Sequence, residues 1–264
     1  MFRSPIVSST LNLFTFVNRN HPLRQRVRKL HISPAFIHIP RQKLKNNILN
    51  QATTCKMATF SNADTGDKAA DPYYAKNIDT KSNLKEKVEA LAKFVSSCKF
   101  GMMTTRDATQ GKLVSRCMAV AGKEGGDIDL TFTTNTESHK TDELKTDKHT
   151  NISFYDNSGQ WASIAGEVSI LTDREAVKKY YSPSLKAWLG DLGDGIHDGS
   201  ASDPRIGILK VKTNSVTYAL TDGTMVGRLA EIAKGTITGE PAGVSKLREI
   251  SEEEVREWRA TASR

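Results

Sequence analysis

Several features that would place this chain in a familiar class are missing from its sequence. No apolar run approaches the roughly eighteen residues that a membrane-spanning helix needs. The three cysteines, Cys55, Cys98 and Cys117, show no C-x-x-C or Cys/His spacing suited to zinc, and their odd number argues against a disulfide framework. No G-x-G-x-x-G motif follows a predicted strand, which argues against a Rossmann domain. These absences fit a protein of a reducing compartment with neither a membrane span nor a metal site.

Acidic residues are also missing from the first part of the chain. Residues 1–56 contain ten Lys and Arg and no Asp or Glu. Subtracting these ten from 38 basic residues leaves 28 basic against 30 acidic residues for 57–264, a balance of −2, although the whole chain carries +8. The excess of positive charge therefore belongs to the N-terminal stretch, and the remainder gives no reason to expect nucleic-acid binding.

The N-terminal stretch has the composition of a mitochondrial transit peptide, being rich in arginine, free of acids and interspersed with apolar residues. Residues 28–33 have the arginine, apolar and serine spacing of a matrix processing site. We expect 1–56 to be a targeting leader and the full-length form to be mitochondrial. The alternative is a translation start at Met57, which would give a cytoplasmic protein. Residues 57–80 are predicted to form a flexible linker.

The next part of the chain, residues 81–220, has the pattern of a small β-barrel. An amphipathic helix is predicted over 82–98, opening at Ser82 or Asn83. Six or seven short strands, joined mostly by short turns and interrupted by one helix at 138–148, favour a barrel over a parallel sheet. The predicted strands are 100–105, 112–121, 128–134, 150–155, 161–171, 206–213 and 215–220.

The strand at 128–134 runs into a helix whose start carries two cationic or titratable residues. Ser138 stands at the N-cap position, and His139 and Lys140 follow at the first two helical positions. A helix start is electropositive, so a cation there costs stability unless an anion lies beside it. Asp142 and Glu143 can supply part of that anion, and a bound phosphate would supply it better. A solvated helix start remains the alternative.

A second cation lies on the strand at 112–121. Val114, Arg116, Met118 and Val120 share one face of this strand. An arginine on an apolar face must reach an anion, a carbonyl or solvent. The alternative is an edge strand along which the arginine extends to water. On the strand at 161–171, Trp161 is placed to contact a flat ligand, the core or a dimer interface.

Three blocks of sequence resemble the pyridoxamine 5′-phosphate oxidase-like flavin-binding split barrels, and most closely their general stress protein branch. They are Ser115-Arg116-Cys117-Met118, the run from Phe132 to Lys140, and Gln160-Trp161 ahead of Gly166. The resemblance implies a mainly β fold with peripheral helices, a six-stranded Greek-key split barrel. It further implies a homodimer with FMN in clefts between the subunits.

The resemblance also implies roles for individual residues. Arg116 and Lys140 would neutralise the FMN phosphate, and Ser138 would add a hydroxyl. One doubly charged phosphate would thus account for both unusual cations. Trp188 resembles a family tryptophan near the dimer cleft. The other implied cofactor-binding positions are Cys117, Met118, Thr133, Thr134, His139, Gln160 and Trp161.

The rest of the chain is less informative. Residues 190–199 are rich in Gly and Asp. This composition suits either a calcium-binding loop or a flexible loop that serves as a lid, and we prefer the flexible loop. Residues 221–264 are predicted to be a C-terminal extension, in which 221–243 wraps the surface and a capping box at 251–254 opens an amphipathic helix.

Three functional hypotheses follow. The first is an FMN-dependent oxidoreductase that uses NAD(P)H or another small reductant. The second is a non-catalytic flavin-binding stress or light-response protein, acting as a buffer or sensor, and the third is a barrel that has lost its cofactor. No residue pair indicates a general base or nucleophile, and flavin chemistry does not require one. True pyridoxamine phosphate oxidation is disfavoured because the chain lacks the Arg-Leu-x-Pro-like end that accompanies that activity.

Overall fold

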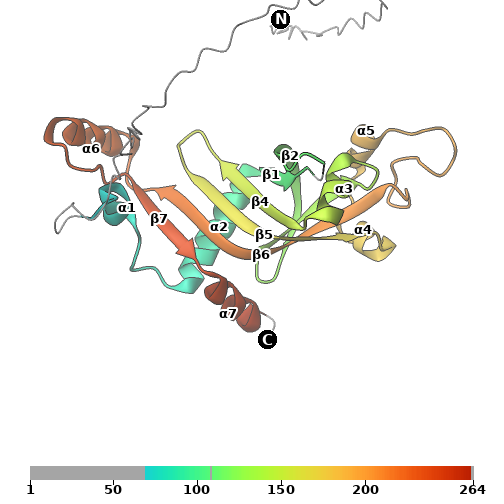
Figure 1. Ribbon diagram of the computed structural model, residues 1–264, viewed down its shortest axis with the longest axis horizontal. Coiled ribbons are helices and arrows are strands. Elements are labelled where there is room, and N and C mark those ends of the chain that lie inside the picture. The colour runs from blue at the N-terminus through green and yellow to red at the C-terminus, as the bar shows by residue number, and fades with distance from the viewer. Residues whose placement is uncertain (1–68, 108, 263–264) are drawn as a thin grey trace, which may run out of the picture. The chain divides into compact units, whose positions relative to one another are not determined.

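The computed structural model describes residues 69–107 and 109–262 (Figure 1). The predicted targeting leader and most of the predicted linker lie outside the described residues. None of the described helices is long and apolar enough to cross a lipid bilayer.

Six antiparallel strands form a closed β-barrel (Figure 1). In space they follow the order β3-β2-β1-β4-β5-β6, and a further pairing of β3 with β6 closes the sheet. The first four strands lie in the order β4-β1-β2-β3, which defines a Greek key. The predicted six-stranded Greek-key barrel is therefore confirmed. The strands are β1 (Phe100–Arg106), β2 (Leu113–Glu124), β3 (Asp129–Asn135), β4 (His149–Tyr155), β5 (Trp161–Leu171) and β6 (Ile206–Thr221).

The barrel interior is filled by the inward-facing side chains of alternate strand positions. Met103, Phe132, Ile152, Ile164 and Leu209 are fully buried there. Helix α2 (Leu84–Cys98) adds its apolar stripe to the same core. Its start is the predicted one, because an Asn83–Glu86 capping box satisfies two amides that would otherwise lack acceptors.

Strand β6 differs from the prediction of two separate strands. It is one continuous strand in which Asn214 is the extra residue of a β-bulge, since Ser215 pairs with Ala165 and Thr213 with Gly166. A side chain at Gly166 would lie 2.5 Å from the Lys212 carbonyl oxygen, so only glycine fits there. Asn214, the residue between the two predicted strands, is thus the site of a bulge, and the strand continues through it.

Two segments predicted to be irregular contain regular structure. Helix α1 (Pro72–Asn77) lies in the predicted linker, and the Asn77 side chain bonds to the backbone of Ala242, Val244 and Ser245. The predicted wrap at 221–243 is mostly helix α6 (Met225–Thr238), which is followed by strand β7 (Ser245–Ile250) paired with the second half of β6. Glycines inside α6 obscured its periodicity in the sequence.

The remaining helices lie around the barrel. Helix α3 (His139–Thr146) connects β3 to β4, and the predicted capping box of Ser251 and Glu254 opens α7 (Glu252–Ala262). Between β5 and β6 lie α4 (Arg174–Tyr180), a 3₁₀ turn (Pro183–Leu185, η2) and α5 (Lys186–Leu189).

Candidate functional site

The connection from β3 to α3 forms one wall of the candidate site. The Asn135 side chain accepts the Glu137 amide at 2.9 Å, which turns the chain out of the strand. Ser138 has the extended backbone of an N-cap, as predicted, but its hydroxyl makes no capping hydrogen bond. That hydroxyl instead lies 3.1 Å from the Lys140 ammonium and 3.2 Å from the Thr141 hydroxyl. Ser138 is therefore oriented toward the lysine and away from the free amides of the helix.

Lys140 is a buried cation, with only 7% of the residue exposed. Its ammonium donates to the hydroxyls of Thr134 and Ser138. Burial, helped by the nearby charge of Arg116, lowers the pKa of Lys140 to about 8, and Glu143 opposes this effect. The described residues hold this ammonium through neutral hydroxyls, and an anion beside it would stabilise its charge.

Arg116 extends from β2 to the same place. Its Nη1 donates to Glu143 Oε2 at 2.8 Å and its Nη2 to Glu143 Oε1 at 2.7 Å. Nη1 also donates to the Thr105 hydroxyl, which itself donates to Glu143 Oε2 at 2.6 Å. Arg116 holds the pKa of the Glu143 carboxyl below its usual range. Of the partners expected for an arginine on an apolar face, the structure shows an anion supplied by α3.

The guanidinium of Arg116 has donors beyond those that bind Glu143. No hydrogen bond of Nε–H, or of the outer Nη2–H on the same edge, is found among the described residues, and 28% of the side chain is exposed. This edge has the spacing that binds two oxygens of a phosphate or carboxylate side by side. Two cations and one carboxylate give the cluster a net charge of about +1 at neutral pH. The cluster therefore fits an added anion in both charge and geometry.

Some of the other predicted site residues lie in this cluster, and others lie beside it on the same strands or on the outer face of the barrel. Thr134 lies in it, and Thr133 is the neighbouring residue on β3. Met118 shares the inward face of β2 with Arg116, whereas Cys117 lies on the exposed outer face. His139 is exposed at the start of α3.

Three predicted positions are not joined to the cluster within this chain. Gln160 bonds to Asp156 at 2.7 Å and accepts the Thr221 amide, so it braces the β4–β5 turn. Trp161 is 37% exposed on the outer face of the barrel, and Trp188 is 86% exposed on α5.

A shallow hollow lies further along β2. It has a volume of about 430 Å³ and is mainly apolar. The first residue of β2 that lines this hollow is Ala119, which lies three positions after Arg116 in the sequence. Its lining residues are Val95, Ser96, Lys99, Phe100, Ala119, Val120, Ala121, Gly122 and Lys123.

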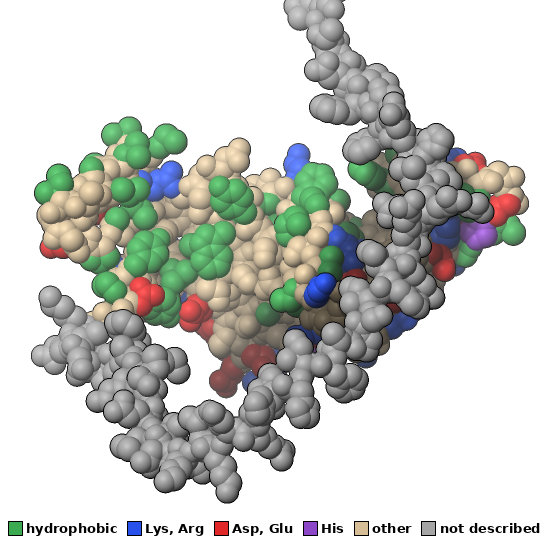
Figure 2. Space-filling model, turned by 45° about the horizontal axis from the view of Figure 1, so that its top comes forward, with side chains coloured by type: hydrophobic (Ala, Val, Ile, Leu, Met, Phe, Trp, Pro, Cys, Tyr) green, Lys and Arg blue, Asp and Glu red, His purple; other side chains and the backbone are tan. Residues whose placement is uncertain are grey.

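The outer face of the barrel carries exposed apolar side chains (Figure 2, green). Met102 pairs with Cys117 across β1 and β2, and Tyr155 pairs with Trp161 across β4 and β5. Isolated exposed apolar residues are ordinary, but neighbouring strands with a shared apolar face are typical of an interface. We call this surface the outer apolar face; it comprises Phe100, Met102, Leu113, Cys117, Ala119, Tyr155 and Trp161.

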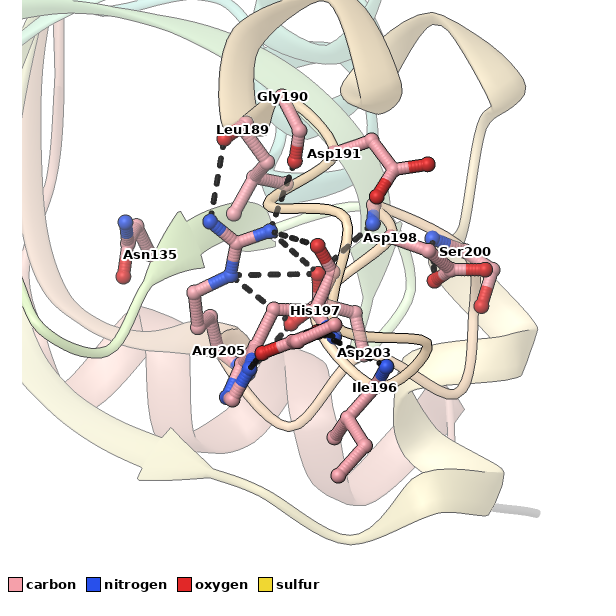
Figure 3. Close-up of polar contacts among 12 residues, drawn as sticks. Asn135, Leu189, Gly190, Asp191, Ile196, His197, Asp198, Ser200, Asp203 and Arg205 are labelled. Carbon is pink, nitrogen blue, oxygen red and sulfur yellow. Dashed lines mark hydrogen bonds and ion pairs between the residues drawn. The ribbon is translucent and has the colours of Figure 1, made fainter.

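The Gly/Asp-rich segment after α5, predicted to be a flexible loop, is irregular in backbone, and its polar contacts centre on one ion pair (Figure 3). Arg205 bonds to the fully buried Asp203 at 2.6 Å and to the carbonyls of Leu189, Gly190 and His197. Other aspartates of the loop accept backbone amides, and such bonds hold their carboxylates in turns. The Arg205 carbonyl accepts the Thr136 amide at 2.8 Å, so this ion pair also supports the chain leading into α3.

Sequence reasoning missed two residues of the cluster. The sequence gives Thr105 no recognisable role and indicates Glu143 only as a charge near the helix start. The signals were present, because strand alternation turns Thr105 inward and Glu143 lies one helical turn after Lys140. Neither signal indicates that the two would meet Arg116.

Comparison with known proteins places the chain in a family. It matches the family described as pyridoxamine 5′-phosphate oxidase like over residues 86–242. It is 57% identical over 203 residues to protein bli-3 of Neurospora crassa, covering 76% of this chain and 97% of that protein.

Solved structures of lower similarity also align with the chain. A general stress FMN/FAD binding protein from Xanthomonas citri aligns with a TM-score of 0.44 and 21% identity, covering 53% of this chain and 93% of that one. A pyridoxamine 5′-phosphate oxidase-related, FMN binding protein from Nostoc punctiforme PCC 73102 aligns with a TM-score of 0.42 and 15% identity, covering 53% and 85%.

The fold is a six-stranded Greek-key barrel with a cluster of two cations and one carboxylate beside its inserted helix. The chain belongs to the pyridoxamine 5′-phosphate oxidase-like family.

Proposed function

We propose that this protein binds FMN, with the phosphate held by Arg116, Lys140 and Ser138. The observation that carries the proposal is the meeting of two cations from different elements, one buried and one with an unused donor edge. A phosphate dianion would match the two positive charges of Arg116 and Lys140 and would accept from all three side chains. The flavin itself is inferred from the family resemblance of the three sequence blocks.

The isoalloxazine ring is expected along β2, beyond the phosphate. Backbone groups of 116–121 and the mainly apolar hollow that begins at Ala119 offer a surface for a flat ring. When bound, FMN would supply hydride or single-electron transfer. The residues of this chain would bind the phosphate, orient the ring and shield one of its faces.

We propose further that the outer apolar face is the contact between two copies of this chain. Trp161 lies on that face, whereas Trp188 lies on α5, and neither reaches the phosphate cluster of its own chain. A second copy would cover the exposed apolar side chains and add a wall to the flavin cleft. Sedimentation at micromolar concentration should give the mass of a dimer, and a Tyr155→Glu variant should shift it toward a monomer.

The activity that fits best is that of an FMN-dependent oxidoreductase using NAD(P)H or another small reductant. The alternative is a flavin-binding stress protein without catalysis, acting as a buffer or sensor. For the full-length form we propose a mitochondrial location on the composition of residues 1–56.

Purified protein tests these proposals in sequence. Flavin absorbance and binding of added FMN support the cofactor, and bleaching by NADH or NADPH followed by reoxidation in air supports the oxidoreductase. Retention of full FMN affinity by a protein carrying both Arg116→Ala and Lys140→Ala would refute the phosphate site. Import of a reporter fused to residues 1–56 into isolated mitochondria tests the location.

A further inference from the structure

Glu143 occupies a position that the proposed phosphate site does not by itself explain. A carboxylate beside a phosphate repels it, yet this one is central to the cluster, with 8% of its side chain exposed. It lies on the same helix as Lys140, one turn further along, and it binds the arginine of β2.

The geometry of the ion pair determines which edge of Arg116 is presented. Glu143 takes the end of the guanidinium, Nη1 and Nη2, through both of its oxygens. The Thr105 hydroxyl holds Oε2 at 2.6 Å, so the carboxylate is itself fixed. When a fixed carboxylate binds both terminal nitrogens of an arginine, the guanidinium cannot rotate about the axis of the side chain. Its side edge, formed by Nε–H and the outer Nη2–H, therefore keeps one direction.

The charge of Glu143 acts on the second cation as well. Burial and Arg116 both lower the pKa of Lys140, and Glu143 is the charge that raises it. The other neighbours of this ammonium are the neutral hydroxyls of Thr134 on β3 and Ser138 at the helix start. The charge of Asp107, in the loop after β1, raises the pKa of the Glu143 carboxyl and so opposes the effect of Arg116. His139, next in the chain, is exposed.

We propose that Glu143 is the positioning residue of the phosphate site: it grips the end of Arg116 so that the side edge faces the phosphate, and it keeps Lys140 charged. This inference rests on the proposed binding of FMN. It assigns the carboxylate a function beyond stability, because buried ion pairs alone are often replaceable by apolar residues without loss of stability.

The test compares FMN with riboflavin, which lacks the phosphate, in wild-type protein and in Glu143→Gln. Binding is measured by flavin fluorescence from pH 7.5 to 9.5, where ordinary imidazoles are neutral and the phosphate remains a dianion. In wild type, FMN affinity should begin to fall as the pH passes about 8, where Lys140 loses its proton. Riboflavin binding should not show this fall.

The Glu143→Gln variant should differ in two ways. Its preference for FMN over riboflavin should drop about tenfold, because an amide cannot accept from both ends of the fork. In this variant the fall in FMN affinity should already be under way at pH 7.5, where the titration starts, because the charge that supports the ammonium is gone. Loss of stability alone would move neither readout.

Two further variants separate the effects. Glu143→Asp keeps the charge but is one methylene too short to reach the fork, so it should keep the wild-type pH dependence and lose preference for FMN. This variant carries the test if Glu143→Gln does not fold. Asp142→Asn removes an exposed carboxylate from the same helix and should change neither readout.

Two results would overturn the inference. One is an FMN preference in Glu143→Gln at least equal to that of wild type, since repulsion would then be the main effect of the carboxylate. The other is an unchanged pH dependence. Failure of wild-type protein to bind FMN better than riboflavin would instead refute the proposed function.

Discussion

Two arginine–carboxylate pairs in this molecule differ in what they leave unused. Arg205 directs its Nε, Nη1 and Nη2 to Asp203 and to three carbonyls, and Asp203 is fully buried. Arg116 directs only the end of its guanidinium to Glu143 and Thr105.

The difference separates a structural arginine from a binding one. A saturated guanidinium holds its loop and has little to offer a ligand, whereas one with an unused edge beside a buried lysine has both charge and geometry to offer an anion. Mutations at the two pairs should therefore affect different measurements.

The largest effect is expected at the saturated pair. Arg205→Ala leaves Asp203 buried without a counter-charge, which should lower the free energy of unfolding by about 3–5 kcal/mol. Urea denaturation measures this change. Arg205→Lys keeps the charge but not the fork, and should also be destabilised. If Arg205→Ala unfolds like wild type, the loop does not depend on this pair.

At the open pair, the effect should appear in binding. Arg116→Lys keeps a cation beside Glu143 but loses the planar edge, so FMN affinity should fall roughly ten- to a hundredfold with a smaller change in stability. Fluorescence titration and urea denaturation of the same sample compare the two quantities. A loss of stability that exceeds the loss of binding energy would place Arg116 with Arg205 as a structural residue.

The buried lysine predicts a pH dependence of the FMN-free protein. Because the pKa of Lys140 is about 8 when folded and lies near its ordinary value of 10.5 when unfolded, the unfolded state binds more protons between these values. Stability contributed by this residue should therefore rise as the pH increases from 8 to 10.5, by on the order of 1–2 kcal/mol. Subtracting the profile of Lys140→Met isolates this contribution, and identical profiles would contradict it.

The smallest effect concerns the two N-caps. Asn83 is part of a capping box, so Asn83→Ala should cost about 1 kcal/mol. Ser138 makes no capping bond, so Ser138→Ala should cost less than about 0.5 kcal/mol in the FMN-free protein when it is made in a Lys140→Met background, where the bond of Ser138 to the ammonium is already absent. Thermal unfolding of both variants measures the difference. Equal losses would show that Ser138 caps its helix in solution.

The barrel was predictable because its signals are local. Strand alternation, turn residues and the capping boxes at Asn83 and Ser251 each act over a few positions. The bulge at Asn214 and the helix α6 were not predictable in this way. Asn occurs at turns as well as at bulges, and glycine occurs in irregular segments as well as inside helices, so neither residue distinguishes the two structures.

The candidate site was predictable only in part. Arg116 and Lys140 stood out because each breaks a local rule, one on an apolar face and one at a helix start. The grip of Glu143 on Arg116 joins positions 27 residues apart, and no local pattern indicates it. The arrangement of the Gly/Asp-rich loop likewise depends on Arg205, which lies beyond residues 190–199 and is not part of their Gly/Asp pattern.

The pairing of β7 with β6 has a mechanical consequence. The two strands are antiparallel, so a pull on the C terminus would separate their register pairs one after another. The bonds of Arg259 to Asp129 and Thr213 attach α7 to the barrel and would have to break first. Under force, the C-terminal extension should therefore detach in two small steps, first α7 and then β7. The closed barrel should remain folded, because its strands resist the force together.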